Sequence, residues 1–215
     1  MITHALTLML LAAEPSVSTH YAPAMDRVVG GAMAPAALSA GTVAFWGMFG
    51  APDIGVGYRQ GFSLLEFDAQ ARFNYLELST LFDVGARVSI MRRDRLNFAA
   101  TAGLGLDFNS GSVYYDRANF ASVALRPRVG AVASYLVSDT VQALLTVEVP
   151  WAISLNVNGV HIDPKVGAGA EFHLGGRLSV LAMGEIGVDV LKAPLGATQV
   201  RPAWALRLGF GYRLF

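Results

Sequence analysis

The sequence predicts an all-β protein, an antiparallel up-and-down transmembrane β-barrel, and three observations support this prediction. Apolar residues alternate with polar or small ones in segment after segment between residues 41 and 215. The chain is 53% hydrophobic with a mean hydropathy of +0.45, yet it has no apolar run of the roughly 18–20 residues that a spanning helix needs. Short and long connections alternate as well, which is typical of membrane barrels with two different ends.

Composition narrows the classes of function. The 16 basic and 16 acidic residues give a formal net charge of zero, so we expect no broad electrostatic attraction to nucleic acid. The chain has no cysteine, which excludes disulfides and thiolate metal sites. We expect neither a cofactor nor a metal ion.

The N-terminal residues predict an export signal. The apolar stretch ALTLMLLAA at residues 5–13 has the length and position of the hydrophobic region of a signal peptide, and a small-x-small site follows at residues 22–24. We expect residues 1–24 to be a signal peptide and leader, although no Lys or Arg precedes the stretch, and a disordered leader or a misassigned start is the alternative. Residues 25–40 predict a flexible periplasmic lead-in, and residues 41–215 predict the barrel.

The segment from residue 64 to residue 75 illustrates the alternation. One face of an extended strand receives its apolar residues and the other its polar residues, namely Leu65, Phe67, Ala69, Ala71, Phe73 and Tyr75 against Glu66, Asp68, Gln70, Arg72 and Asn74. The same period of two recurs over 76–91, 96–108, 123–137, 141–151, 162–174, 178–190 and the last strand of the chain. A helix would break this pattern within one turn, so each segment predicts a strand.

The number of strands follows from these segments and their connections. Eight strands are clear from residue 64 onward, and residues 41–50 and 53–60 add one more hairpin, so ten strands are favoured. Eight strands plus a periplasmic or plugging segment is the alternative. Residues 60–63, 92–95, 138–140 and 175–177 predict short periplasmic turns, whereas 109–119, 155–160 and 192–202 predict longer outer loops.

The apolar face is expected to contact lipid, because an eight- to ten-stranded barrel has too little interior for so many large apolar side chains. The opposite face carries glycines, which fit a crowded lumen, and charges of both signs. We therefore predict a lumen charge network, joined by Arg59, that consists of Glu66, Asp68, Arg72, Asp83, Arg87, Asp107, Arg126, Arg128, Glu148, Asp163, Lys165, Glu171, Glu185, Asp189, Arg207 and Arg213.

Aromatic residues on the apolar face predict two girdles. Phe98 and Phe108 would lie roughly 24 Å apart along the membrane normal, close to the roughly 25 Å apolar band of such barrels. The turn assignment places Tyr135, Phe172 and Tyr212 near the periplasmic end and Phe73, Tyr75, Trp151 and Trp204 near the outer end. The alternative is that aromatic residues simply favour strands.

In its alternation, its turn asymmetry, its leader and its terminal strand AWALRLGFGYRLF, residues 41–215 resemble the small bacterial outer-membrane β-barrel proteins of 8 to 12 strands. This resemblance implies localisation in the bacterial outer membrane and insertion by the barrel-assembly machinery. It also implies contact with the lipid bilayer and lipopolysaccharide. We expect a monomer.

The leading functional hypothesis is a non-enzymatic envelope protein with a polar, closed lumen and a structural or surface-exposed role. A narrow channel for small solutes is the first alternative. The second is a lipid-modifying enzyme at the rim, for which His161 near Asp163, Ser154 on the same loop, and His173 near Glu171 are the candidates. Catalysis would need these side chains within hydrogen-bond reach, and the sequence contains no nucleophile elbow or lipase-type motif.

Overall fold

The computed structural model describes residues 38–93, 95–116 and 118–214. They form β1 (Val43–Ala51), β2 (Asp53–Phe62), β3 (Leu65–Asn74), β4 (Ser79–Arg93), β5 (Leu96–Ser110), β6 (Ala121–Ser138), β7 (Val141–Ser154), β8 (Val160–Ile162), β9 (Lys165–Leu174), β10 (Leu178–Lys192) and β11 (Thr198–Arg213). Both β8 and β9 pair with β7 and β10, so they are two pieces of one barrel strand. The barrel therefore has ten strands, which confirms the predicted number.

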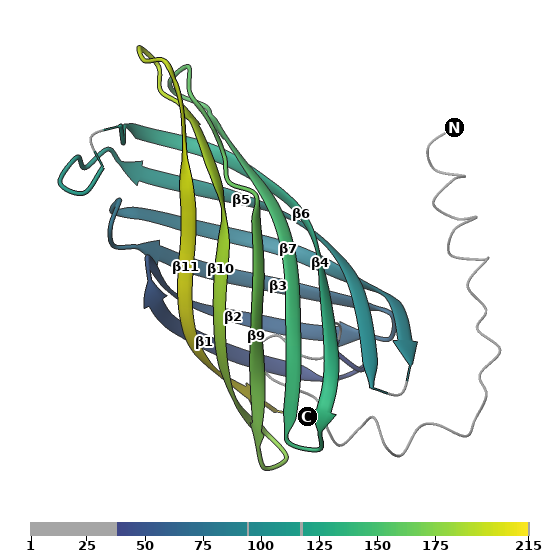
Figure 1. Cartoon of the computed structure of the whole chain (residues 1–215). Helices are drawn as coiled ribbons and strands as arrows, with labels where there is room; N and C mark the ends of the chain where they lie inside the picture. Colours follow the sequence, from purple (N-terminus) through teal and green to yellow (C-terminus); the bar gives the residue numbers. More distant parts are fainter. Residues whose placement is uncertain (1–37, 94, 117, 215) are drawn as a thin grey trace, which may run out of the picture.

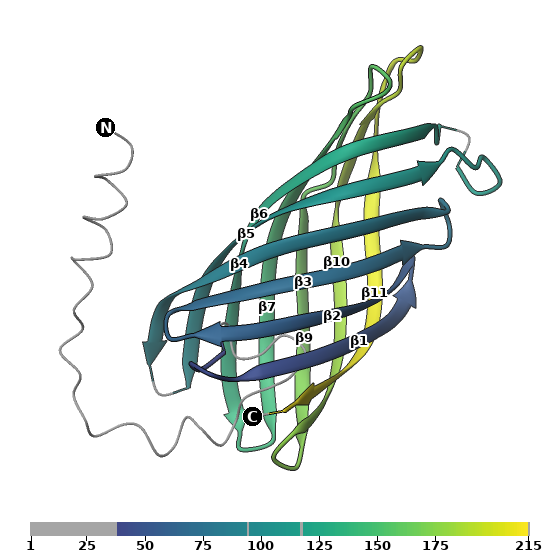
Figure 2. The ribbon, with the colours of Figure 1, turned by 180° about the vertical axis from the view of Figure 1, so that it is seen from behind.

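The sheet closes because β1 pairs with β11, from Ala44 opposite Arg213 to Ala51 opposite Leu206. All the remaining pairs join barrel strands that follow one another in the chain, and these pairs are antiparallel too. This gives the up-and-down order seen from two sides in Figures 1 and 2. Closure pairs the backbone groups of both edge strands, as a membrane interior requires.

The two ends of the barrel differ as predicted. At the short-turn end, residues 63–64, 139–140 and 175–177 and the short connection between Arg93 and Leu96 join the strands. At the loop end, residues 75–78, 155–159 and 193–197 and the longer connection between Ser110 and Ala121 join them, whereas Pro52 alone joins β1 and β2. β11 begins at Thr198, so residues 198–202, predicted as loop, are strand instead. Their pairing with β10 lengthens the hairpin that rises above the loop end in Figure 1.

Exposure separates the two faces of each strand. On β11, Leu206, Leu208 and Phe210 are 62%, 48% and 53% exposed, whereas Arg207 between them is 8% exposed. A continuous apolar exterior of this kind would be unfavourable in water and suits a lipid environment. The face predicted to point outward therefore does so. Among the described residues, no helix is long and apolar enough to cross a membrane.

Most of the predicted girdle residues lie on this exterior. Their side chains are exposed or half-buried at Phe73, Phe98, Phe108, Tyr135, Trp151, Phe172, Trp204 and Tyr212. Tyr75 differs, because it lies in the turn after β3 and its hydroxyl donates to the Gly50 carbonyl at 2.9 Å. The Asn74 side chain accepts from the amides of Leu76 and Glu77, and this turn ends the strand one residue before Tyr75.

Candidate functional site

The lumen brings together most of the charged residues that the sequence singles out. Its short-turn end is filled by fully buried side chains. We call this layer the inner seal: Leu38, Arg59, Glu66, Ser134, Gln142, Glu171 and Ser179, each less than 2% exposed. All seven come from the ends of strands next to the short turns, or from the segment that precedes β1. The predicted signal peptide and most of the lead-in lie outside the described residues.

The Arg59–Glu66 pair is the centre of the inner seal. The Arg59 guanidinium donates to both Glu66 carboxylate oxygens, at 2.7 and 2.9 Å, in the two-pronged geometry that suits these groups. The Leu38 amide donates to the same carboxylate at 2.7 Å, and Arg87 approaches it at 3.5 Å. Residues before β1 thus close the end of the lumen together with β2, β3 and β4.

The other side of the inner seal uses uncharged donors. Gln142 donates to the Ser134 hydroxyl at 2.9 Å, and Ser179 donates to the Glu171 carboxylate. His173 lies on the same lumen face two residues from Glu171, at the end of β9.

In the middle of the lumen, Arg128 on β6 reaches the carboxylates of Asp83 on β4 and Asp68 on β3, at 2.6 and 2.7 Å. Two glycines make room for it. A Cβ at Gly85 would lie 2.5 Å from the Arg128 guanidinium, and one at Gly103 would lie 2.6 Å from its Nε. Lumen crowding therefore accounts for glycine at these two positions.

A second group of ion pairs lies between Arg128 and the loop end. Arg207 on β11 donates to both oxygens of Asp53 at 3.2 Å and also contacts Glu185. Arg72 approaches the same Asp53 at 3.8 Å. Glu148 on β7 lies 3.9 Å from Arg128 and so borders the Arg128 group.

The lumen is not polar throughout, which corrects part of the prediction. Leu144, Leu181 and Met183 are buried on the inner face and pack with Trp46 of β1. Leu181 and Met183 lie an even number of residues from the lumen residue Ser179, so the alternation places them on the same inner face of β10. A Cβ at Gly57 would lie 2.3 Å from the Trp46 indole, which explains the small residue opposite it.

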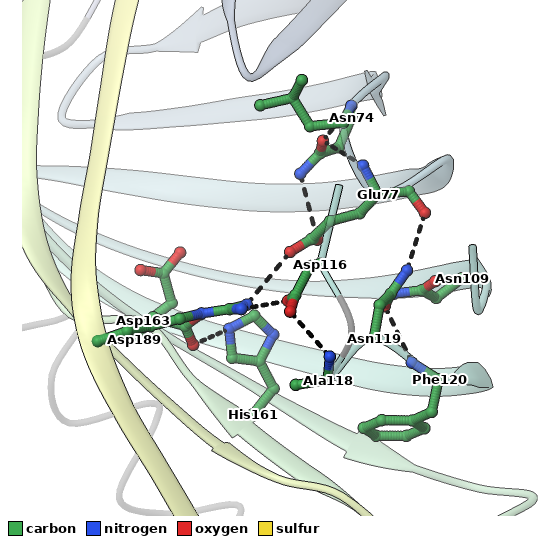
Figure 3. A network of polar contacts seen from close by, with 12 residues as sticks. Asn74, Glu77, Asn109, Asp116, Ala118, Asn119, Phe120, His161, Asp163 and Asp189 are labelled. Atoms are coloured by element: carbon green, nitrogen blue, oxygen red, sulfur yellow. Dashed lines mark hydrogen bonds and ion pairs between the residues drawn. The ribbon is translucent and has the colours of Figure 1, made fainter. Parts of the chain in front are cut away.

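Arg201 organises the loop end through three carboxylates. Figure 3 labels these partners, Glu77, Asp116 and Asp189. Its guanidinium contacts Asp189 on β10, Asp116 in the β5–β6 connection, and Glu77 at 3.5 Å. Asn119 fastens the same connection by donating to the carbonyls of Ser112 and Glu77, at 2.8 and 3.1 Å. Burial raises the pKa of the Glu77 carboxyl above its ordinary value.

The described residues enclose an outer and an inner cavity in the lumen. The outer cavity, of about 240 Å³, extends from Tyr115 and Asp116 at the rim to Arg72 and Arg207. The inner cavity, of about 80 Å³, adjoins Trp46 and is lined by the same two arginines. No residue of the inner seal lines either cavity.

The candidate catalytic side chains do not form a triad. His161 on β8 faces the lumen, where its Nε2 contacts Asp189. Asp163 instead contacts Lys165 and approaches Arg126 at 3.9 Å. Ser154 and His161 both line a small void of about 30 Å³, without a hydrogen bond between them among the interactions of the described residues. In the described part of the chain, no group of three or more His, Asp or Glu side chains is placed to hold a metal ion.

Arg213 departs from the expected network. It donates to the Gly176 carbonyl at 2.7 Å, because the end of β11 lies beside the β9–β10 turn, and so it meets a backbone oxygen in place of a lumen carboxylate. Four residues of the observed network were absent from the predicted one, namely Asp53, Glu77, Asp116 and Arg201. Asp53 and Glu77 follow the polar phase of their segments, whereas Asp116 and Arg201 stood in predicted loops.

Comparisons with known proteins concern the fold. No family model and no curated protein matches this chain. Among solved structures, it is similar to KdgM porin at 10% identity and a TM-score of 0.42, over 81% of this chain and 99% of that one. It is similar to the structure titled "Bacterial polysaccharide outer membrane secretin" at 10% identity and a TM-score of 0.47, over 78% of this chain and 58% of that one. It is similar to OmpTdeltaL8 of Vibrio cholerae at 10% identity and a TM-score of 0.36, over 75% of this chain and 63% of that one. Each likeness is one of fold.

Proposed function

We propose that this chain is an integral protein of the bacterial outer membrane with a sealed lumen, a non-enzymatic barrel with a structural or surface-exposed role. The observation that carries the proposal is the inner seal. Seven side chains from around the barrel are fully buried at the short-turn end, and they include the two-pronged pair of Arg59 and Glu66. A solute that enters from the loop end meets this layer below both cavities.

The chemistry of the inner seal favours a durable closure. Removing one partner of a buried ion pair costs about 3–5 kcal/mol, because it leaves an uncompensated charge. Glu66 is paired with Arg59 at 2.7 Å and also has Arg87 and the Leu38 amide beside it, so an opening that moves Arg59 away would incur much of that cost. The seal is therefore expected to stay closed without a partner or ligand.

The alternative of a narrow channel is supported by the two cavities that meet at Arg72 and Arg207. Rearrangement of these arginines would join the cavities, but a continuous path would also require the inner seal to open. For the enzyme alternative, His161 is directed to the lumen, away from the lipid that a rim-active enzyme must reach.

Conductance tests the sealed lumen. The full chain, reconstituted in a planar bilayer, is expected to give no reproducible single-channel steps. Insertion is established separately by heat-modifiable migration in a gel and by protease protection in vesicles. A lack of conductance can then not be due to a lack of inserted protein. Reproducible steps from inserted protein would replace this proposal with the channel.

Membrane placement is tested by fractionating cells that produce the full chain. We expect recovery with the outer-membrane fraction and release by detergent. Recovery in the soluble fraction without detergent would contradict the proposed location. Assays of phospholipid hydrolysis and acyl transfer on the same material test the proposed lack of enzymatic activity.

A further inference from the structure

The pairing of the barrel wall is interrupted beside its last strand, at the loop end. β1 ends at Ala51, which pairs with Leu206, so among the described residues 198–205 of β11 pair with β10 alone. Figure 2 shows β11 continuing above the end of β1. Pro52 is the whole connection from β1 to β2 and so forms a low lip beside the tall β10–β11 hairpin. The unpaired edge of β11 faces this lip.

The outer cavity reaches the same place. Pro52 lines it on one side and residues 202–204 line it on the other. Trp204 has the outward strand phase and is 48% exposed, so this wall of the cavity extends to the lipid-facing surface. Trp204 is a predicted girdle residue, and Phe73, another, pairs with Ile54 just after the lip. The side opening between Pro52 and Trp204 therefore lies at the boundary between lipid and water.

A groove on the exterior of β1, β10 and β11 begins at the side opening. It has a volume of about 550 Å³, and its outward-facing lining is apolar, namely Phe49, Ala51, Ala182, Gly184, Leu206 and Leu208. We call it the side groove. Its upper end adjoins the opening, because Ala51 precedes Pro52 and Leu206 follows Trp204 on the same face. Arg207 lines both the side groove and the outer cavity, so the two hollows meet at one residue of β11.

Arg72 on β3 lies just inside the lip. It lines both lumen cavities and its side chain is 13% exposed, but among the interactions of the described residues it makes no hydrogen bond. Its nearest acid is Asp53, the residue after Pro52, at 3.8 Å. Both oxygens of Asp53 already accept from Arg207 at 3.2 Å. Arg72 is thus a lumen guanidinium with donors available to a ligand, and a carboxylate matches their two-pronged geometry.

We infer that the barrel binds a single-chain amphiphile with a carboxylate head, a long-chain fatty acid, through its side opening. The carboxylate accepts from Arg72 in the outer cavity, and the chain lies in the side groove. The ligand comes from the lipid, so the inner seal stays closed while it binds. This inference rests on the proposed membrane placement and goes beyond the proposed structural role, which assigns no ligand.

The test is quenching of tryptophan fluorescence by 2-bromododecanoate, with the full chain in vesicles. Its bromine, next to the carboxylate, would lie beside Trp204. The matched control is 2-bromododecan-1-ol, which has the same chain and bromine but no charge. The alcohol enters a bilayer at least as readily, so partitioning alone cannot make the acid the stronger quencher. We expect saturable quenching by the acid at about a tenfold lower concentration than the alcohol requires.

Equal potency of the acid and the alcohol, or acid quenching that does not saturate, would overturn the inference. Insertion of the same sample is measured by heat-modifiable migration in a gel. Protein that does not insert would contradict the membrane placement, whereas inserted protein that does not distinguish acid from alcohol contradicts the fatty-acid site alone.

Arg72→Met tests the head of the ligand. It leaves Asp53 with both hydrogen bonds from Arg207, and it is expected to weaken the acid about tenfold, to the potency of the alcohol. Arg95→Met, at an exposed position of the short-turn end, is the matched control and should change neither compound. Full potency of the acid in Arg72→Met would contradict the assignment of the head.

Gly184→Leu tests the chain. A Cβ at Gly184 meets only Leu206 within 4 Å, at the ordinary distance of 3.5 Å, so the larger side chain can occupy the side groove. It is expected to weaken the acid about tenfold, because it takes the apolar surface that the chain would cover. Unchanged potency would contradict the assignment of the chain. The comparison of acid with alcohol uses the parent chain, so it decides the matter even if a variant folds poorly.

Discussion

Arg201 on β11 contacts Asp116 in the connection between β5 and β6, although β11 and β5 stand on opposite sides of the barrel. In a closed ring of ten strands, the fifth and the tenth are as far apart as two strands can be. The contact therefore spans the mouth of the lumen and fastens the β5–β6 connection across it.

This fastening predicts that Asp116→Asn loosens the β5–β6 connection. Arg201 is 30% exposed, so water and salt screen the pair and its worth is expected to be at most about 1 kcal/mol. Amide hydrogen exchange between residues 111 and 116 should accelerate about two- to fivefold. Asp139→Asn, at the short-turn end, should leave exchange in this connection unchanged. Equal protection in the parent and Asp116→Asn would show that the pair with Arg201 does not hold the connection.

Gly103 predicts a cost of adding a single methyl group to the lumen. Its Cβ would lie 2.6 Å from the Arg128 Nε, so Gly103→Ala must displace a guanidinium held by two carboxylates. Such overpacking is expected to lower the free energy of unfolding by about 1–3 kcal/mol.

The matched control for this variant is Gly176→Ala, because a Cβ at Gly176 meets no atom within 4 Å and its φ is not left-handed. Equilibrium unfolding by urea in vesicles provides the measurement. A loss as large for Gly176→Ala as for Gly103→Ala would contradict the crowding explanation.

The sequence predicts the strands and their two faces well, because burial on a barrel follows a period of two. Arg207 and Leu208 are adjacent in sequence, yet one is buried in the lumen and the other lies on the exterior, as their phase predicts. Lumen partners are harder to predict, because contact across the lumen depends on barrel closure and stagger. Arg128 and Asp68 are three strands apart, and no local pattern relates them.

The rim was predicted less well for a related reason. Arg201 stood in a predicted loop, because Gly196 and Pro202 in this stretch favour irregular structure. Pairing of residues 198–202 with β10 overrides that preference. The apolar lumen patch was missed in a different way. Leu181 and Met183 have the lumen phase, but the prediction assigned them to neither face because it treated the lumen as polar.

Arg128 predicts a large, partly recoverable loss of stability. Arg128→Met leaves the carboxylates of Asp68 and Asp83 without their shared cation, and the free energy of unfolding should fall by about 3 kcal/mol or more. Arg128→Met combined with Asp83→Asn also removes one of the two carboxylates left without a cation, so it should recover part of the lost stability. Urea unfolding of both variants provides the measurement. A double variant less stable than Arg128→Met would contradict the ion-pair account.

The exterior of the barrel predicts a cost of charge that depends on position. Leu104 lies midway along β5 on the outward face and is 47% exposed, so Leu104→Arg would place a cation in the middle of the lipid. The expected loss in vesicles is about 2–4 kcal/mol in the free energy of unfolding. Leu195, in the β10–β11 connection, is fully exposed beyond the strands, and Leu195→Arg should change stability by about 1 kcal/mol or less. The two substitutions introduce the same side chain at exposed leucines, so a larger cost at Leu104 is the result expected if the middle of the exterior faces lipid. Equal costs at both positions would mean that the middle of the exterior does not face lipid.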